Sequence, residues 1–376
     1  MHVLFIRSNS VNPDSRVEKE VYTLLLNGID VDILCWDRES DHPITTEKKE
    51  VWNLHCPIHR VGCKASYGGG MKKNLIPLLR FQKAIKTYLK ENHEEYDVIH
   101  ACDFDTAFTA IRYAKKYGIR FVYDIFDYYV DAFNVPNSLK NSIERIDHNI
   151  IDHANAVIIC SEEREGQIRG TKPQNLTVIH NSPMRVPSTN VIADTDISDK
   201  LKVAYIGILN DGRMLPELVD VISNNQQLEL HIGGFGKYEQ LIREYANRCE
   251  NIVFYGKVPY DRTIEIEKEC DVITAIYDPQ VPNHIYAAPN KFYEGLMLGK
   301  ALIMCRGTGM SAAVAENHLG VLIDYNVESL ANALEGMYQN KKEVMHLAKR
   351  GTELYDSFYS WETMADRLIT LYKKIS

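Results

Sequence analysis

The chain has 376 residues, of which 45% are hydrophobic and 25% charged, a size that supports two domains with separate cores. Its net charge of −8 argues against nucleic acid as a partner. The eight cysteines lack the close spacing of zinc or redox motifs and indicate reduced thiols of a cytoplasmic protein. We expect no signal peptide, because residues 1–6 form a short apolar strand. No apolar run approaches the roughly 20 residues that cross a bilayer.

The first half of the chain alternates apolar strands with helices. A strand at 2–6 is followed by a polar loop, a helix that Gly28 ends, and a strand at 31–35. This strand–helix–strand order requires a parallel sheet. Further strands are expected at 97–100, 120–123, 156–159 and 176–179.

A polar stretch at 185–200 shows no periodicity and is the predicted linker. A second α/β series follows, with strands expected at 202–206, 228–232, 251–255, 272–275, 301–304 and 320–323. We therefore predict an α/β fold of two doubly wound, Rossmann-like domains that face a cleft. Ligands of such sheets bind at the carboxyl ends of the strands.

The segment 288–300 indicates a loop that becomes a helix and stops at a glycine. Pro289 suits the first helical turn, and Gly299 can adopt the left-handed conformation that ends a helix. Lys291 and Glu294 fall in the expected first turn, where free N–H groups attract an anion. Lys291 can add charge to a bound phosphate, and Glu294 can accept two sugar hydroxyls. Without further context, an ordinary surface helix with one lysine and one glutamate is the simpler explanation.

This segment resembles the second half of the sugar-nucleotide motif of glycosyltransferase family 4, whose members are retaining enzymes of the GT-B fold. In that family a helix carries two glutamates separated by seven residues, and Glu294 matches the second, which holds the ribose. Tyr286 occupies the place of the first glutamate, which affects the expected contact with the donor sugar. Phe126 likewise replaces the usual histidine of the first domain. The run from Pro289 through Asn290 to Glu294 is similar to a subgroup acting in bacterial surface polysaccharide assembly.

Three other loops of the second series resemble the family's donor site. Gly207 follows a strand, and Arg213 matches the basic residue that grips the diphosphate, for which its planar fork is suited. Gly234 lies in a glycine cluster that lets a ligand approach the backbone. Val258 matches the segment whose backbone groups read the nucleotide base. Each of these residues also has a purely structural explanation as part of a turn.

Strand ends of the first series supply candidate catalytic and acceptor-side residues. Asp103 and Asp127 follow two strands in segments that resemble the family's site, and His100 ends a strand. These three residues are the candidate catalytic groups, although a lone histidine at a strand end is more often structural. In the polar loop after the first strand, Asn9 and Arg16 are the candidate acceptor-side residues.

The segment 51–90 contains no Asp or Glu but carries eight of the chain's Lys and Arg residues. Over 72–90, apolar residues interleave with these charges. Such a basic amphipathic helix can lie on an anionic membrane surface. An ordinary solvated helix face is the alternative, and the sequence leaves both open.

The resemblance runs nearly end to end. It implies a GT-B fold with an acceptor-side domain at 1–184, a nucleotide-sugar-binding domain at 201–355, and a helix at 356–376 that crosses back to the first domain. It also implies a retaining, metal-independent hexosyltransferase that uses a nucleoside-diphosphate sugar, with UDP slightly favoured, and a glycan or polyprenyl-linked acceptor. No cofactor is expected. The expected location is the cytoplasm, with a further option at the inner face of the cell membrane. Two alternatives remain: a non-catalytic nucleotide-sugar-binding protein, and a sugar-nucleotide epimerase on the same scaffold.

Overall fold

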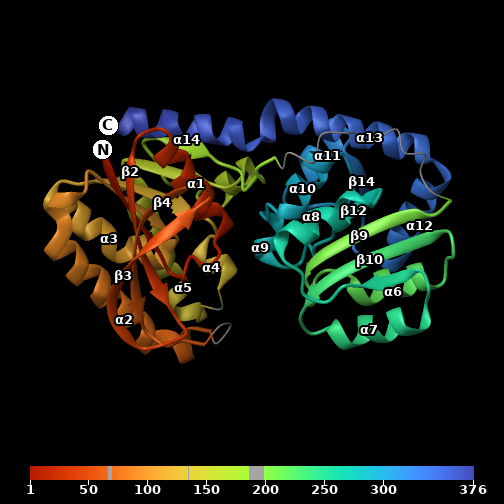
Figure 1. Ribbon diagram of the computed structural model, residues 1–376, viewed down its shortest axis with the longest axis horizontal. Coiled ribbons are helices and arrows are strands. Elements are labelled where there is room, and N and C mark those ends of the chain that lie inside the picture. Colours follow the sequence, from red (N-terminus) through yellow and green to blue (C-terminus); the bar gives the residue numbers. More distant parts are fainter. Residues whose placement is uncertain (67–69, 134, 186–198) are drawn as a thin grey trace. The chain divides into compact units, whose positions relative to one another are not determined.

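A computed structural model describes residues 1–66, 70–133, 135–185 and 199–376, without the side chains of residues 70–73. The chain divides into two compact units (Figure 1): an N-terminal unit of residues 1–180 and 364–376, and a C-terminal unit of residues 181–363. Most of the linker expected at 185–200 lies outside the described residues. The first boundary falls after residue 180 instead of 184, and the last falls after residue 363 instead of 355.

The N-terminal unit is an α/β unit. Its strands are β1 (His2–Arg7), β2 (Asp30–Asp37), β3 (His42–Val51), β4 (Leu54–Gly62), β5 (Val98–Cys102), β6 (Arg120–Ile125), β7 (Ala156–Ile159) and β8 (Leu176–Val178). Its helices are α1 (Ser15–Leu26), α2 (Gly70–Asn92), α3 (Phe104–Tyr117), α4 (Tyr129–Ala132) and α5 (Asn137–His153). Among the described residues the strands form one sheet in the order β3-β4-β2-β1-β5-β6-β7-β8, in which only β3 is antiparallel to its neighbour.

The β3–β4 hairpin is the element that the sequence analysis missed. Most of β3 is exposed, and its run of threonines, glutamates and lysines lacks the apolar alternation that predicts a strand. Charged side chains on an edge strand discourage pairing with another molecule. On β4, Arg60 reaches back to Glu47 of β3 and helps to hold the pair together. The other strands expected in this half of the chain are all present.

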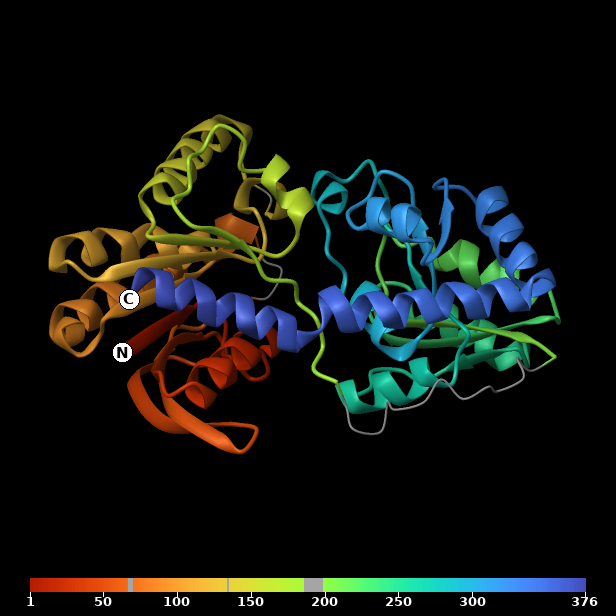
Figure 2. The same ribbon diagram turned by 90° about the horizontal axis from the view of Figure 1, so that it is seen from above.

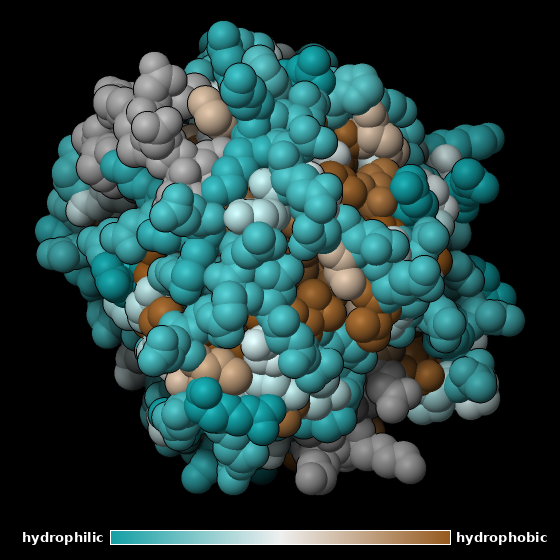
Figure 3. All heavy atoms as spheres, turned by 90° about the vertical axis from the view of Figure 1, so that its right-hand side faces the viewer, coloured by the Kyte–Doolittle hydropathy of each residue, from teal (hydrophilic) through white to brown (hydrophobic). Residues whose placement is uncertain are grey.

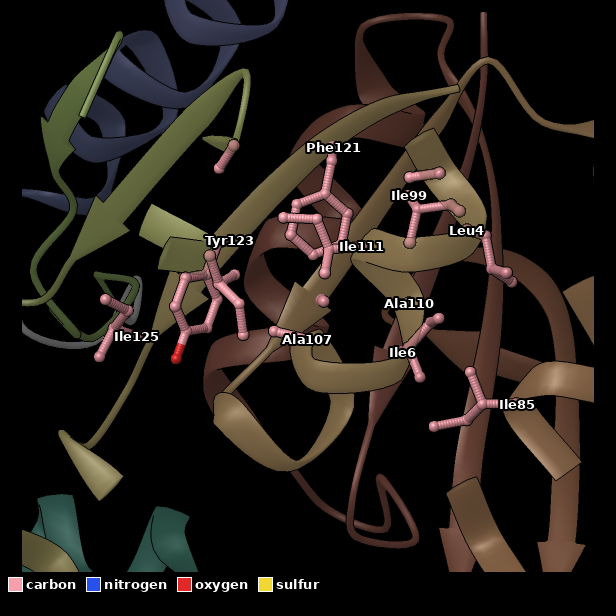
Figure 4. Close-up of a cluster of buried hydrophobic side chains, with 14 of the residues drawn as sticks. Leu4, Ile6, Ile85, Ile99, Ala107, Ala110, Ile111, Phe121, Tyr123 and Ile125 are labelled. Atoms are coloured by element: carbon pink, nitrogen blue, oxygen red, sulfur yellow. The ribbon is translucent and has the colours of Figure 1, made fainter. Parts of the chain in front are cut away.

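The core of the N-terminal unit lies between its sheet and the helices that cover it. Figure 4 shows Leu4, Ile99 and Phe121 of three strands beside Ala107 and Ile111 of α3, and all five are buried. Alanine on α3 lets the helix approach the sheet closely. Burial of such apolar surface contributes about 25 cal/mol per Å² and is the main stabilising term for this layer.

The C-terminal unit repeats this plan. Its strands are β9 (Leu201–Ile208), β10 (Leu228–Phe235), β11 (Ile252–Phe254), β12 (Val272–Ala275), β13 (Ala301–Cys305) and β14 (Gly320–Ile323). Its helices are α6 (Leu215–Ser223), α7 (Glu239–Arg248), α8 (Tyr260–Lys268), α9 (Pro282–Ile285), α10 (Asn290–Leu298), α11 (Ser311–Asn317), α12 (Val327–Gln339) and α13 (Lys341–Leu354). The six strands found among the described residues are the six that the sequence predicts for this half, and all their pairings are parallel.

The order of the strands decides where each unit can bind a ligand. In the C-terminal unit the order is β11-β10-β9-β12-β13-β14, so the chain leaves β9 on one side and later returns to its other side at β12. At this reversal the loops after β9 and β12 diverge, which opens space at the carboxyl ends of the strands. The N-terminal unit has the same reversal between β1 and β5.

The chain ends on the N-terminal unit through α14 (Trp361–Ile375), which Figure 2 shows running along that unit to the C-terminus. The Tyr372 hydroxyl lies 2.8 Å from His100 Nδ1 in the interior. Near the start of the helix, the Met364 sulfur accepts a hydrogen bond of 3.1 Å from the His180 N–H. These contacts attach the end of the chain to the sheet of the N-terminal unit.

The end of the C-terminal unit that faces the viewer in Figure 3 is predominantly hydrophilic, and its apolar side chains show in small separate groups. Within the described part of the chain, every helix is too short or too polar to span a lipid bilayer.

We expect Tyr372→Phe to lower the free energy of unfolding by about 1–3 kcal/mol, because the buried His100 Nδ1 would lose its hydrogen-bond partner. Urea unfolding followed by circular dichroism measures this change. Tyr338→Phe is the matched control, since no hydrogen bond of its hydroxyl is found among the described residues, and it should change stability by less than about 0.5 kcal/mol. Equal losses in both variants would contradict the prediction.

Candidate functional site

Two glycines and a lysine meet at the carboxyl ends of the strands in the C-terminal unit. A Cβ at Gly207 would lie 2.6 Å from Lys291 Nζ, so a side chain there would displace the ammonium group. Gly234 has a φ of +135°, and a Cβ there would lie 1.7 Å from the carbonyl oxygen of Gly207. Gly234 therefore requires glycine, whereas a side chain at Gly207 would displace the end of Lys291. Together the two glycines leave bare backbone beside the Lys291 ammonium group.

The Lys291 side chain lies against aromatic rings rather than beside an acid. Its Nζ is 4.6 Å from the centroid of the Tyr205 ring. Among the described residues no carboxylate oxygen lies within 4.0 Å of this ammonium group. Burial opposes its charge, but Tyr205, Tyr277 and more distant carboxyl groups outweigh burial and raise the pKa of Lys291. The lysine is charged and has no ion-pair partner in the described structure.

Arg213 is the second cation at these strand ends. Its Cζ lies 4.1 Å from the centroid of the Tyr277 ring, in a cation–π contact, and its Nη1 lies 3.1 Å from His284 Nε2. It too has no carboxylate within 4.0 Å in the described part of the chain. The Tyr205 side chain interacts with both Arg213 and Lys291, so the two cations share one aromatic neighbour.

Glu294 lies deeper than the sequence predicts. The helix α10 begins at Asn290, with Pro289 as its cap residue, so Glu294 falls in the second turn instead of the first. Its exposed fraction is 5%, and therefore the alternative of an ordinary surface helix is wrong for this residue. The Tyr260 hydroxyl of α8 donates a hydrogen bond to its carboxylate. The predicted left-handed end of the helix is confirmed, since Gly299 has a φ of 63°.

Glu267 is a neighbour of Glu294 that the sequence analysis missed. It lies on α8 and is completely buried, and neither of its carboxyl oxygens has a hydrogen-bond partner among the described residues. Burial and the nearby Glu294 raise the pKa of Glu267 well above its usual range, while Lys291 acts in the opposite direction. Burial thus favours the protonated form of Glu267 beside the candidate ribose ligand. In the sequence, Glu267 is one of several acidic residues on a charged helix. No local pattern distinguishes it from the acids that face solvent.

The remaining candidates of this unit lie in its loops. Asn290 Oδ1 accepts a hydrogen bond of 2.9 Å from Asn181 Nδ2. Val258 follows β11 and is partly exposed, and Tyr286 is the partly exposed residue that ends α9. No hydrogen bond or ion pair in the described part of the chain joins Val258 or Tyr286 to Arg213 or to Lys291.

In the N-terminal unit, Asp103 organises the turn after β6. Its Oδ1 accepts hydrogen bonds of 2.9 Å from the Phe126 N–H and 3.2 Å from the Asp127 N–H, and its Oδ2 pairs with Arg7. Burial raises the pKa of Asp103 to about 6, against the opposing charge of Arg7. The Asp127 side chain is 49% exposed and bonds to Arg164 at 3.1 Å. Asp127 is thus open to solvent, and Asp103 holds its backbone.

The predictions for His100 and Arg16 need correction. His100 is completely buried, with its Nδ1 at the Tyr372 hydroxyl. Arg16 belongs to α1 rather than to a loop, and its Nη2 bonds Asp124 at 2.8 Å while its Nη1 bonds the Ile179 carbonyl at 2.9 Å. Both side chains are enclosed by their partners, which is the position of structural groups, so neither is carried forward as a substrate contact.

The Asn9 side chain forms hydrogen bonds within its own loop. Its Nδ2 donates to Asp14 at 2.7 Å, and its Oδ1 accepts from the Val11 N–H at 2.8 Å, so both ends of the amide shape the loop. Phe126 lies between the guanidinium groups of Arg7 and Arg16, whose Cζ atoms are 4.2 and 4.6 Å from its ring centroid.

Three residues of the N-terminal unit have the spacing of metal ligands, although the sequence suggested no such cluster. Ligand atoms of His100, Cys102 and Asp124 all lie within 4.8 Å of one another in the interior. Asp124 is already bonded twice by Arg16, and burial together with Asp124 raises the pKa of the Cys102 thiol well above its usual range. A protonated thiol and a paired carboxylate are poor ligands, so this arrangement fits a buried polar network better than a metal centre.

Two family models match the sequence. The one described as Glycosyl transferase 4-like domain matches residues 16–182, and the one described as Glycosyl transferases group 1 matches residues 202–340. A search of curated proteins finds no match.

Solved structures resemble the chain over its whole length. Sucrose-phosphate synthase from Thermosynechococcus elongatus has a TM-score of 0.75 at 17% identity, with 100% of this chain and 99% of that chain covered. HepE of Anabaena in complex with UDP-glucose has a TM-score of 0.69 at 14% identity, with 100% of both chains covered. A glycosyltransferase from Rickettsia africae has a TM-score of 0.67 at 14% identity, with 100% and 98% covered. The predicted class of two Rossmann-like domains is confirmed.

The burial of Glu267 predicts a dependence of stability on pH. A carboxyl group whose pKa is higher in the folded than in the unfolded state destabilises the protein as pH rises from about 4.3 through the folded pKa, by about 1.4 kcal/mol for each unit of difference. Glu267→Gln keeps the shape but cannot ionise. We expect this variant to melt at a higher temperature than the parent at pH 8, with a smaller difference at pH 4.5.

Differential scanning calorimetry across this pH range measures the effect. Glu269→Gln is the matched control, because Glu269 is exposed just after the same helix and should leave the pH profile unchanged. A difference between parent and Glu267→Gln that stays constant with pH would contradict the prediction.

Proposed function

We propose that this chain, which belongs to the family 4-like glycosyltransferases of the GT-B fold, transfers a hexose from a nucleoside-diphosphate sugar to a hydroxyl of a glycan or lipid-linked glycan, with retention. The observation that carries the proposal is the pair of cations, Arg213 and Lys291, which have no carboxylate partner among the described residues. They lie beside Gly207 and Gly234, at the carboxyl ends of the strands of a parallel sheet. The form of segment 289–294 supports a place in the assembly of bacterial surface polysaccharide.

The donor would be held at both ends of its ribose diphosphate. Glu294 accepts the ribose hydroxyls, and Arg213 and Lys291 bind the two phosphates together with the free N–H groups that open α10. As the bond between the sugar and the diphosphate breaks, negative charge develops on the departing phosphate. Cations already in place stabilise that charge without reorganisation, so the proposed reaction calls for no metal ion.

The acceptor side of the proposal rests on the N-terminal unit. Asp127 is an exposed carboxylate of this unit at the end of a strand, and Asp103 accepts hydrogen bonds from the N–H groups of Phe126 and Asp127. An exposed carboxylate can accept hydrogen bonds from sugar hydroxyls. We therefore propose Asp127 as the acceptor-side group and Asp103 as the residue that positions it.

A second candidate function is supported by the two departures from the family pattern. Phe126 lies packed between two guanidinium groups and can neither donate nor accept a proton, and Tyr286 replaces an acid. A protein with these changes could keep the donor site and bind nucleotide sugars without transferring them. Turnover separates the two functions.

A calorimetric screen of UDP, GDP, ADP and CMP tests the donor site first. UDP is the nucleotide that we favour, since HepE, which shares the fold, was solved with UDP-glucose. Incubation of the corresponding nucleotide sugar with a panel of glycan acceptors then tests transfer, and NMR of the product reports whether the anomeric configuration is retained. Binding without release of diphosphate would favour the binding protein.

We further propose that α2 meets an anionic membrane surface at the cytoplasmic side, where a lipid-linked acceptor would be found. Leu75, Ile76 and Leu79 are 47%, 66% and 59% exposed. Lys83 and Lys86 continue the same exposed stripe at helical spacing. The helix thus presents apolar side chains followed by positive charge, as interfacial helices do. Lys72 and Lys73, which belong to the expected basic segment, have side chains outside the described structure.

Removal of either cation should weaken the binding of diphosphate specifically. We expect Lys291→Met and Arg213→Gln each to weaken UDP binding by about tenfold or more, since a charge-assisted hydrogen bond contributes about 1.5–3 kcal/mol. Binding of uridine should change little, because it lacks the phosphates. Isothermal titration calorimetry measures both affinities.

Two further variants sharpen this test. Glu294→Gln should weaken UDP and uridine alike, because both ligands carry the ribose. Lys342→Met, on the exposed side of α13, is the control and should leave both affinities unchanged. Equal losses of UDP and uridine in Lys291→Met or in Arg213→Gln would show that these cations do not clamp the diphosphate.

If α2 meets the membrane, its apolar and its basic side chains should each contribute to vesicle binding. Replacing Leu75, Ile76 and Leu79 with serine should abolish flotation with vesicles of phosphatidylglycerol and phosphatidylcholine. Replacing Lys83 and Lys86 with glutamine should weaken it and reduce its dependence on salt, because exposed charges are screened beyond about 8 Å at physiological ionic strength.

Lys342→Gln with Lys349→Gln removes the same number of exposed charges from α13 and serves as the control. All variants should bind UDP like the parent. Flotation of the serine variant at the level of the parent would leave α2 as an ordinary solvated helix.

A further inference from the structure

His284 of α9 contacts two loops, that of Arg213 after β9 and that of Asp278 after β12. Its Nε2 lies 3.1 Å from Arg213 Nη1, and its Nδ1 lies 3.0 Å from the carbonyl oxygen of Asp278. Its ring meets the Tyr277 ring edge-on, with centroids 4.9 Å apart. A Cβ at Gly212 would lie 3.0 Å from His284 Cε1, so the backbone before Arg213 also packs against the imidazole.

These contacts define where the proton of His284 resides. A carbonyl oxygen can only accept, so the Nδ1 that faces Asp278 carries the proton. A guanidinium group can only donate, so the Nε2 that faces Arg213 presents its lone pair. Both contacts together require a neutral imidazole. Burial lowers the pKa of His284, the Asp278 carbonyl opposes this, and the charge of Arg213 lowers it further.

Four groups among the described residues contact the Arg213 side chain. Its Cζ lies 4.1 Å from the centroid of the Tyr277 ring, its Nη1 contacts His284 Nε2 and, at 3.3 Å, the carbonyl oxygen of Gly212, and the guanidinium also bonds the Tyr205 side chain. His284 Nε2 accepts at one corner of the guanidinium and, together with the Gly212 carbonyl and Tyr205, limits its rotation over the Tyr277 ring. We propose that His284 is a positioning residue that sets the orientation of Arg213 for the donor diphosphate. This inference rests on the proposed function of Arg213.

Protonation of His284 would break this arrangement. The cationic ring carries an N–H at Nε2 as well, so two donors and two positive charges would face each other. The other titratable groups that face His284 are Asp278 and Tyr277 from the loop after β12. The backbone carbonyl of His284 accepts a hydrogen bond of 3.1 Å from the N–H of Gly309, which carries no charge. Acid should therefore release Arg213 and weaken the binding of the donor.

Two variants and one control test the proposal, with UDP-glucose as the probe because its diphosphate has no group that titrates near neutral pH. At pH 7.5, His284→Phe keeps the aromatic contact but offers no acceptor, and it should weaken binding by about tenfold, as the loss of one charge-assisted hydrogen bond does. His284→Gln can still accept from Arg213 and should bind within about threefold of the parent.

Calorimetry between pH 7.5 and pH 5 supplies the second reading. The affinity of the parent for UDP-glucose should fall with acid, whereas that of His284→Gln should fall much less. His346→Gln, at an exposed position of α13, should keep the profile of the parent. Parent-like binding by His284→Phe at pH 7.5, or an undiminished acid decline in His284→Gln, would overturn the proposal.

The ligand-free protein separates this inference from the proposed function. Imidazole ¹⁵N NMR of the parent should show the proton of His284 on Nδ1, and Arg213→Ala should raise the pKa of His284 because a positive neighbour is removed. An unchanged pKa would overturn the contact itself. Failure of the parent to bind any nucleotide sugar, with these NMR results intact, would instead overturn the proposed function.

Discussion

The parallel sheet of the C-terminal unit, with β9 between β10 and β12, is the constraint on which the candidate site depends. Parallel strands end at one edge, and the reversal of order at β9 sends neighbouring loops apart. Arg213 on the first loop therefore meets Tyr277 on the loop after β12. Lys291 arrives from α10 at the same edge, where Gly207 and Gly234 leave room for it. Backbone geometry places these groups together before any side-chain chemistry is considered.

The two units differ in what surrounds their cationic side chains. In the N-terminal unit Arg7 and Arg16 are paired with carboxylates, since an unpaired charge in the interior is costly. That network supports the sheet and engages both guanidinium groups with carboxylates. In the C-terminal unit Arg213 and Lys291 lie on tyrosine rings, without a carboxylate within 4.0 Å among the described residues. Within 4.0 Å, no carboxylate of the described residues neutralises these two cations, so an anion at this edge meets positive charge.

The departures from the family pattern leave the two candidate donor-side cations, Arg213 and Lys291, in place. Tyr286 ends α9, two residues after His284, and an acid is missing at that place. Phe126 fills a space between two guanidinium groups, where its ring serves packing. Both changes concern groups expected near the reacting sugar. The residues that would grip the nucleotide lie elsewhere, on β9, α10 and the loop of Arg213, and this is why binding and turnover are separable questions for the protein.

The sequence by itself determined the alternation of strands and helices, because apolar runs bounded by turn residues are local signals. It also placed Lys291 and Glu294 on a helix that ends at a glycine. The β3–β4 hairpin escaped because an exposed edge strand lacks apolar alternation. Only the tertiary structure decided which polar groups are accessible. The sequence suggested a catalytic role for His100 because it was expected at the end of a strand, but α14 covers this side chain. Glu267 beside Glu294, and His284 beside Arg213, arise from the packing of α8 and α9, since no local pattern encodes contacts between residues so far apart in the chain.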